Sequence, residues 1–225
     1  QLIRNAIELL ILSQGRVSVT DLYRVVISAP TSAAQKRSPE WQAQSMCFQC
    51  LAQADNRPKS DAKKADLEVV ADYFLIEYPE LSEKTRSVIV STFTSMADVL
   101  MRGILRGLFS ADTNIVPEAV ADGTVLVIDL PVKTFGEVGR FAQVLWKYAF
   151  QRAIERRDVA ENPRPVFLWA DEAQTFITSY DMQFQTTCRS SRVATVYLTQ
   201  NVSNVYAALG GQEKGRVEAA SLFAN

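Results

Sequence analysis

Three short apolar runs in the second half of the chain restrict its possible folds more than any other feature. They are TVLVIDL at 124–130, PVFLWA at 165–170 and RVATVYLT at 192–199, and all three are rich in branched or aromatic residues. Continuous runs of this kind are typical of strands that are buried on both faces of a parallel sheet. Helical patterns at 136–157 and from Tyr180 onward separate the runs, as right-handed crossovers require. We therefore predict a parallel α/β sheet in the second half.

The first half of the chain shows helical periodicity instead, with apolar residues at three- and four-residue steps. Helix start signals such as Ser-Pro-Glu at 38–40 precede some segments, while Gly15 and Pro79 stand where helices are expected to end. We expect a helical lobe followed by an α/β core, with the boundary between Pro79 and Gly123.

Composition excludes several classes of function. The 225 residues contain no His, which removes His-based triads, His-ligated zinc and imidazole acid–base catalysis. Three Cys are too few for a disulfide scaffold and indicate a reducing compartment. No apolar run reaches the ~18 residues that a membrane helix needs. The chain begins at Gln1 with no signal-peptide pattern, so we expect it to be a piece of a longer polypeptide.

Paired acids follow the second apolar run, in the segment VFLWADEAQ. In the Walker B pattern the first carboxylate, here Asp171, holds the water shell of Mg²⁺, and the second, here Glu172, activates the water that attacks the γ-phosphate of ATP. The alternative is a buried strand that simply ends in solvated acids. The phosphate-binding loop G-x-x-x-x-G-K-[ST] that such a site also needs does not occur in these residues, so we expect no ATP hydrolysis by this chain alone.

Polar residues also flank the third run. Arg189 precedes it and Gln200 follows it, about 25 Å away by strand rise. If both act on nucleotides, Arg189 must serve the site of a neighbouring subunit, which implies a ring. The alternative is that Arg189, Arg192 and Gln200 are solvated residues at the two ends of a strand.

The order VLVIDLP, VFLWADEAQ and CRSSRVATVYLTQNVSNVYAALG resembles the motor domain of the TraD/TraG-type coupling proteins of conjugation and type IV secretion. These are RecA-like hexameric ATPases related to the HerA and FtsK DNA translocases. The resemblance implies a partial RecA-like parallel sheet with an all-α lobe in the N-terminal half. Residues 1–18 would be a helix of the motor domain, 19–80 the all-α domain, and 81–225 the C-terminal part of the ATPase core.

The resemblance also implies roles and partners. Asp171 would hold Mg²⁺ through water, Glu172 would be the catalytic base, Gln200 would sense the γ-phosphate of ATP, and Arg189 would act in trans. Ser190-Ser191-Arg192 replaces the family's Gly-rich turn, so Arg192 is an alternative trans arginine. The full-length homo-hexamer would pump single-stranded DNA, or a DNA–relaxase complex, into the secretion channel. Its all-α lobe would bind relaxase, relaxosome or secreted protein.

The resemblance places the motor at the cytoplasmic face of the bacterial inner membrane, with its membrane anchor outside these residues, which we expect to form a soluble fragment. Two alternative functions stay open: a chromosomal translocase of the HerA/FtsK kind, and a non-catalytic substrate receptor. Cys47 and Cys50 form a lone CxxC without a second ligand pair, and we expect both thiols to pack in a core.

Overall fold

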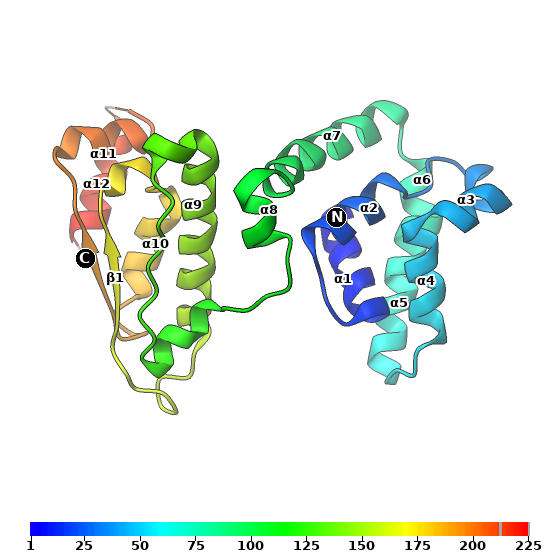
Figure 1. The fold of residues 1–225 in the computed structure, drawn as a ribbon, viewed down its shortest axis with the longest axis horizontal. Coiled ribbons are helices and arrows are strands. Elements are labelled where there is room, and N and C mark those ends of the chain that lie inside the picture. Colours follow the sequence, from blue (N-terminus) through cyan, green and yellow to red (C-terminus); the bar gives the residue numbers. More distant parts are fainter. Residues whose placement is uncertain (212, 225) are drawn as a thin grey trace. The chain divides into compact units, whose positions relative to one another are not determined.

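The computed structural model describes residues 1–211 and 213–224. These residues form two compact units, Gln1–Thr113 and Asn114–Asn225 (Figure 1). Each unit is described separately below. The assignment of residues 1–18, 19–80 and 81–225 to distinct parts of a motor stays a prediction.

The described part of the first unit is helical. Serines begin many of its helices: Ser18, Ser38, Ser45, Ser60 and Ser82 each accept a backbone N–H three residues on, which satisfies a donor that the helix leaves unpaired. The helices are α1 (Leu2–Gln14), α2 (Val19–Ile27), α3 (Pro39–Gln44), α4 (Met46–Asn56), α5 (Asp61–Asp72), α6 (Tyr78–Glu80), α7 (Glu83–Leu100) and α8 (Gly103–Phe109), with a 3₁₀ turn at Gln35–Arg37 and a π-helical turn at Tyr73–Glu77.

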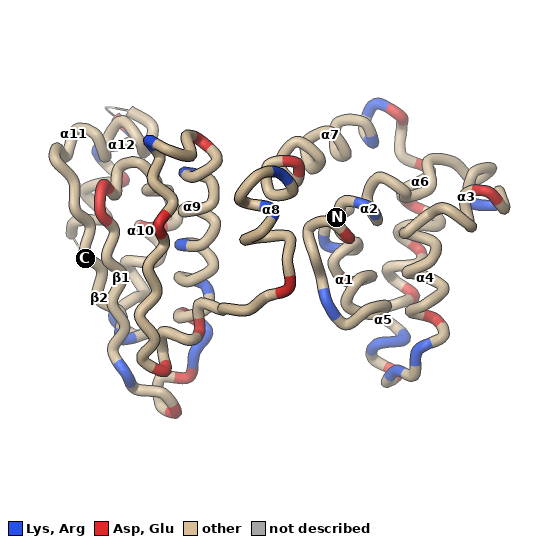
Figure 2. Tube along the Cα trace, viewed as in Figure 1, with Lys and Arg blue, Asp and Glu red and all other residues tan. Residues whose placement is uncertain are grey.

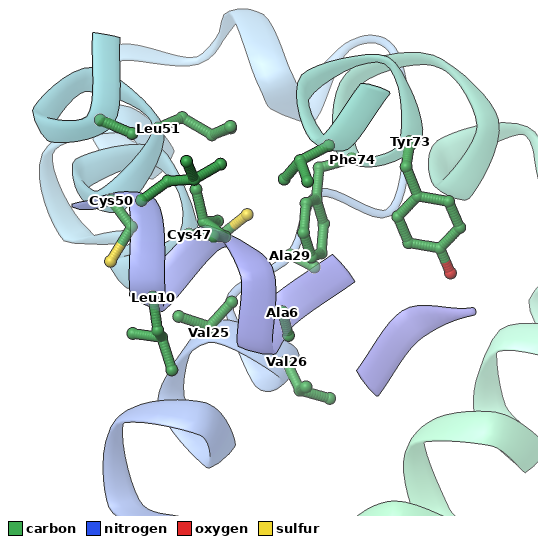
Figure 3. Close-up of a cluster of buried hydrophobic side chains, with 14 of the residues drawn as sticks. Ala6, Leu10, Val25, Val26, Ala29, Cys47, Cys50, Leu51, Tyr73 and Phe74 are labelled. Carbon is green, nitrogen blue, oxygen red and sulfur yellow. The ribbon is translucent and has the colours of Figure 1, made fainter. Parts of the chain in front are cut away.

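The core of the first unit lies between α1, α2, α4 and α5 (Figure 3). Phe74 is fully buried there, and its ring contacts the rings of Tyr73 and Tyr78. Cys47 and Cys50 point into the same cluster, as the core-packing interpretation predicted. Burial raises the pKa of both thiols above its usual value, so they stay protonated and unreactive near neutral pH.

The second unit consists of helices around a small sheet. The strands β1 (Val166–Ala170) and β2 (Val193–Tyr197) are parallel, and Val166 pairs with Val193. One face of this sheet packs on α9 and α10 through Phe150, Ile154 and Phe184. The helices are α9 (Val132–Arg156), α10 (Ser179–Thr187), α11 (Val202–Ala208) and α12 (Lys214–Ala224), with 3₁₀ turns at Pro117–Asp122 and Ala173–Thr175.

The prediction of a RecA-like parallel sheet is wrong for this chain. Helices make up 66% of the structure and strands 4%, and in the described residues the sheet has two strands. Residues 124–130 run as extended backbone, but no backbone hydrogen bond joins residues 125–130 to β1 in the described part of the chain. Val125 and Val127 are 87% and 82% exposed. The apolar run at 124–130 favours an extended backbone, and the segment is extended. A β-strand also needs a hydrogen-bonded neighbouring strand, which the local sequence does not specify.

The helix predicted at 136–157 is present, but it buries a different face. Its apolar residues Val138 and Tyr148 are exposed, whereas the polar Lys147 and Gln151 are buried. The helix also starts four residues earlier than predicted and bends at Gly136, whose φ of 57° and ψ of −142° suit glycine. The buried polar residues indicate a hydrogen-bonded network rather than an apolar contact.

That network centres on Asp181, which is completely buried. Its carboxylate pairs with the Lys147 ammonium and accepts hydrogen bonds from Gln151 Nε2 at 2.8 Å and Tyr197 OH at 3.0 Å. The Thr178 backbone N–H donates to it at 2.7 Å, which completes a capping box at the start of α10. Burial lowers the pKa of Lys147 and raises that of Tyr197. One carboxylate therefore joins α9, α10 and β2.

In the described residues, no single helix is both long and apolar enough to cross a membrane. Two consecutive helices, Glu83–Leu100 and Gly103–Phe109, meet the length and composition criteria when taken together, but they are bent by 92°.

Replacing Asp181 tests the network. Asp181→Asn leaves the buried Lys147 ammonium without its counter-charge, and we expect a loss of about 3–5 kcal/mol in the free energy of unfolding of the second unit. Urea denaturation followed by circular dichroism measures this. The matched control Asp129→Asn changes an exposed carboxylate and should stay within about 0.5 kcal/mol of the parent. Equal effects of the two changes would contradict the role of Asp181.

Phe74 provides a second test, in the first unit. Phe74→Ala removes a ring that is 0% exposed, and the resulting cavity should lower the free energy of unfolding by about 3–5 kcal/mol. Val69→Ala, on the same helical stretch but 66% exposed, is the control and should change little. A thermal or urea melt in which Phe74→Ala behaves like Val69→Ala would show that this core is not closely packed.

Candidate functional site

Two of the predicted site residues meet where the strands end. Because β1 and β2 are parallel and adjacent, the residues that follow them lie at the same edge of the sheet. Pairing continues past the strands, since Leu198 N–H donates to Ala170 O and Ala173 N–H donates to Leu198 O, both at 2.9 Å. These bonds place Glu172 and Gln200 side by side.

Glu172 is held at both carboxylate oxygens. Gln200 Nε2 donates to Oε1 at 2.7 Å, and Gln174 Nε2 donates to Oε2. The backbone of Glu172 is left-handed, with φ of 49° and ψ of 44°, a conformation that non-glycine residues adopt at a cost. Two amide donors and an unusual left-handed backbone thus fix the position of the Glu172 carboxylate at the carboxyl end of the two strands.

The pKa of Glu172 lies below its usual value. The main causes are the hydrogen bonds from Gln174 and then Gln200, which favour the charged form, and Lys133 at the start of α9 adds a smaller attraction. Glu172 is therefore an ionised, oriented carboxylate at neutral pH. Such a group can hold and polarise a water molecule or a cationic ligand.

Asp171 precedes Glu172 and takes no part in the hydrogen bonds from Gln200 and Gln174. It is exposed, and its Oδ1 accepts the backbone N–H of Glu172 at 3.0 Å. In Figure 2 the acidic colouring marks this end of β1. No group of three or more His, Cys, Asp or Glu residues suited to a metal occurs in the described residues. A single carboxylate fits Mg²⁺ only as part of a site in which water and phosphate supply most ligands.

The two arginines lie at the opposite end of β2, in the turn before Val193. Arg192 has a left-handed backbone with φ of 51°, and its Nη1 donates to Pro163 O at 2.9 Å. Arg189 is exposed, and in the described part of the chain its guanidinium has no hydrogen bond or ion pair. The structure therefore does not bring Arg189 to Glu172, and of the two arginines Arg189 is the one that is free to reach another molecule.

Sequence reasoning missed Gln174 and Lys133. Gln174 belongs to the motif DEAQ, and its position two residues after Glu172 within one tight turn was the available signal. Lys133 is distant in sequence, and nothing local indicated it. Asp129, at the end of the first apolar run, is exposed on the extended segment 124–130 and is not part of this hydrogen-bonded group.

The lowered pKa of Glu172 can be measured directly. Gln200→Ala removes the Oε1 donor, so we expect the pKa of Glu172 to rise toward its usual value, as observed by carboxyl ¹³C NMR titration. Because the folded pKa lies below the unfolded one, the stability that Glu172 contributes is present above the unfolded pKa and is lost as the pH falls through the folded pKa. Gln183→Ala, an exposed glutamine on α10, is the control. An unchanged titration in Gln200→Ala would contradict the hydrogen bond.

Comparisons with protein-family models, with curated proteins and with solved structures find no match to this chain.

Proposed function

We propose that this chain supplies the water-orienting side of an ATP site in a DNA-transfer motor of the conjugative coupling kind. The observation that carries the proposal is the 2.7 Å contact between Gln200 Nε2 and Glu172 Oε1 at the ends of adjacent parallel strands. These are the two residues to which the sequence resemblance assigns the catalytic base and the phosphate sensor. The proposal rests on this pair and not on the fold, because the observed two-stranded sheet is not that of a RecA-like motor.

The chemistry of the pair suits ATP hydrolysis. Glu172 is ionised, so it can orient a water molecule and accept its proton, and Gln200 can hold the carboxylate until phosphate competes for its amide. Asp171, with one oxygen not used by the Glu172 N–H, would hold hydrated Mg²⁺. When bound, that ion would supply charge neutralisation on the phosphates.

The remaining parts of such a site must come from elsewhere. No phosphate-binding loop occurs in these 225 residues, so another segment or another chain has to grip the β- and γ-phosphates. Arg189, exposed at the far end of β2, suits the proposed trans contact in a hexameric ring. We further propose single-stranded DNA, relaxase or secreted protein and a type IV secretion channel at the inner membrane as the partners of the assembled protein.

The test is hydrolysis by the assembled protein that contains this chain. Glu172→Gln should lower the rate of phosphate release by about 10²–10⁴-fold, because the proton acceptor is lost, while ATP binding persists. Glu161→Gln, an exposed acid in the loop before β1, should leave the rate unchanged. The 225 residues alone should release no phosphate in a malachite-green assay.

The proposed contact of Arg189 with the ATP site of a neighbouring subunit is tested by a separate substitution. Arg189→Ala should lower turnover by about 10³–10⁵-fold in the assembled ring, whereas Arg192→Ala should affect it less, since Arg192 already bonds Pro163 O. Full activity in both Glu172→Gln and Arg189→Ala would overturn the motor function and favour the non-catalytic receptor. Robust hydrolysis by the 225 residues alone, dependent on Glu172, would show that no outside phosphate loop is needed.

A further inference from the structure

A polar pocket opens in the first unit, at the end of α1. It has a volume of about 500 Å³ and is lined by Ser13, Gln14, Arg16, Asp21, Gln53 and Arg57. Every lining side chain is polar, whereas pockets for small drug-like ligands are mostly apolar. The pocket therefore suits a charged or strongly hydrogen-bonding ligand.

Two arginines give the pocket its donors. Arg57 Nη1 donates to Ser13 O at 2.6 Å, which holds the guanidinium at the end of α1, and its planar fork has further N–H donors. Arg16 lies on the turn after Gly15, the left-handed residue that ends α1. In Figure 2 basic positions are visible both after α1 and in the turn between α4 and α5.

The one acid among the lining residues is already used locally. Asp21 Oδ2 accepts the Ser18 hydroxyl at 2.8 Å, and Ser18 in turn caps α2 by accepting the Asp21 N–H. Two arginines and one aspartate leave the lining residues with an excess of positive charge, and in the described residues no ion pair joins Asp21 to either arginine.

A carboxylate of the chain itself already sits on one of these arginines. Asp112 Oδ1 accepts from Arg16 Nη1 at 2.6 Å, and the two side chains are 88% and 63% exposed. An ion pair this exposed is weak, because water competes for both groups. The contact with Asp112 shows that Arg16 can bind a carboxylate in this position. Another carboxylate can displace Asp112 easily, because the ion pair is weak.

We propose that this pocket binds an acidic peptide segment of a partner protein. One carboxylate of the peptide takes the place of Asp112 on Arg16 while a second pairs with Arg57, and the Gln53 amide bonds the peptide backbone. Asp112 competes with the peptide carboxylate for Arg16 and so weakens the binding of the peptide. The proposal is independent of the nucleotide site, since every residue in it belongs to the first unit.

Fluorescence anisotropy with the 225-residue chain and a labelled hexaglutamate peptide tests the proposal. We expect saturable binding that weakens with salt, and no binding of hexalysine. Arg16→Ala should weaken binding about tenfold through loss of a charge-assisted hydrogen bond, and Arg57→Ala should do the same. Arg24→Ala, an exposed arginine of α2 outside the pocket, is the matched control and should bind as the parent does.

Substitution of Asp112 tests the proposed competition for Arg16 directly. Asp112→Asn should tighten binding about two- to fivefold, because the bound peptide no longer displaces a carboxylate. Asp72→Asn, another exposed acid of the same unit, should not. Circular dichroism confirms folding of each variant, and Arg16→Ala serves alone if Arg57→Ala is unfolded.

Three outcomes would overturn the proposal. One is binding that Arg16→Ala and Arg24→Ala reduce equally, which indicates general charge attraction. Another is no binding of hexaglutamate by either the parent or Asp112→Asn. The third is displacement of the peptide by inorganic phosphate at an equal concentration, which would make the pocket a site for small anions.

Discussion

The buried carboxylate of Asp181 is the interaction on which the second unit depends. A charged group without exposure is stable only when its partners replace the lost water, and here Lys147, Gln151, Tyr197 and the start of α10 do so. The same group explains why α9 turns polar residues inward. Helix and sheet are joined in this unit by charge and hydrogen bonds as well as by apolar packing.

The hydrogen-bonded network around Asp181 also supports the two segments that carry Glu172 and Gln200. Lys147 Nζ also donates to Phe176 O at 2.8 Å, in the loop that follows the Glu172 turn, and Tyr197 is three residues before Gln200. The segment after Glu172 and the strand before Gln200 are therefore both connected to Asp181, the first through Lys147 and the second through Tyr197. The contact is a product of tertiary structure, since 28 residues separate its two members.

The helices could be predicted from the sequence because their signals are local. Ser38 before α3, Gly15 after α1 and the apolar periodicity of the first unit act within one or two turns of chain. The first apolar run could not be judged in this way, because TVLVIDL at 124–130 carries strand preference without specifying a partner. In the site, motif reasoning chose Glu172 and Gln200, whereas Gln174 and Lys133 follow from the turn and from the packing of α9.

The uncovered face of the sheet has a consequence for how the protein behaves in solution. Phe167 and Trp169 are 58% and 68% exposed on β1, on the side away from α9 and α10, and Val125 and Val127 are exposed on the extended segment 124–130. Side chains of this kind attract one another whenever two molecules meet. Self-association of this chain should therefore begin from the native state, so that conditions which only strengthen folding will not keep it dispersed.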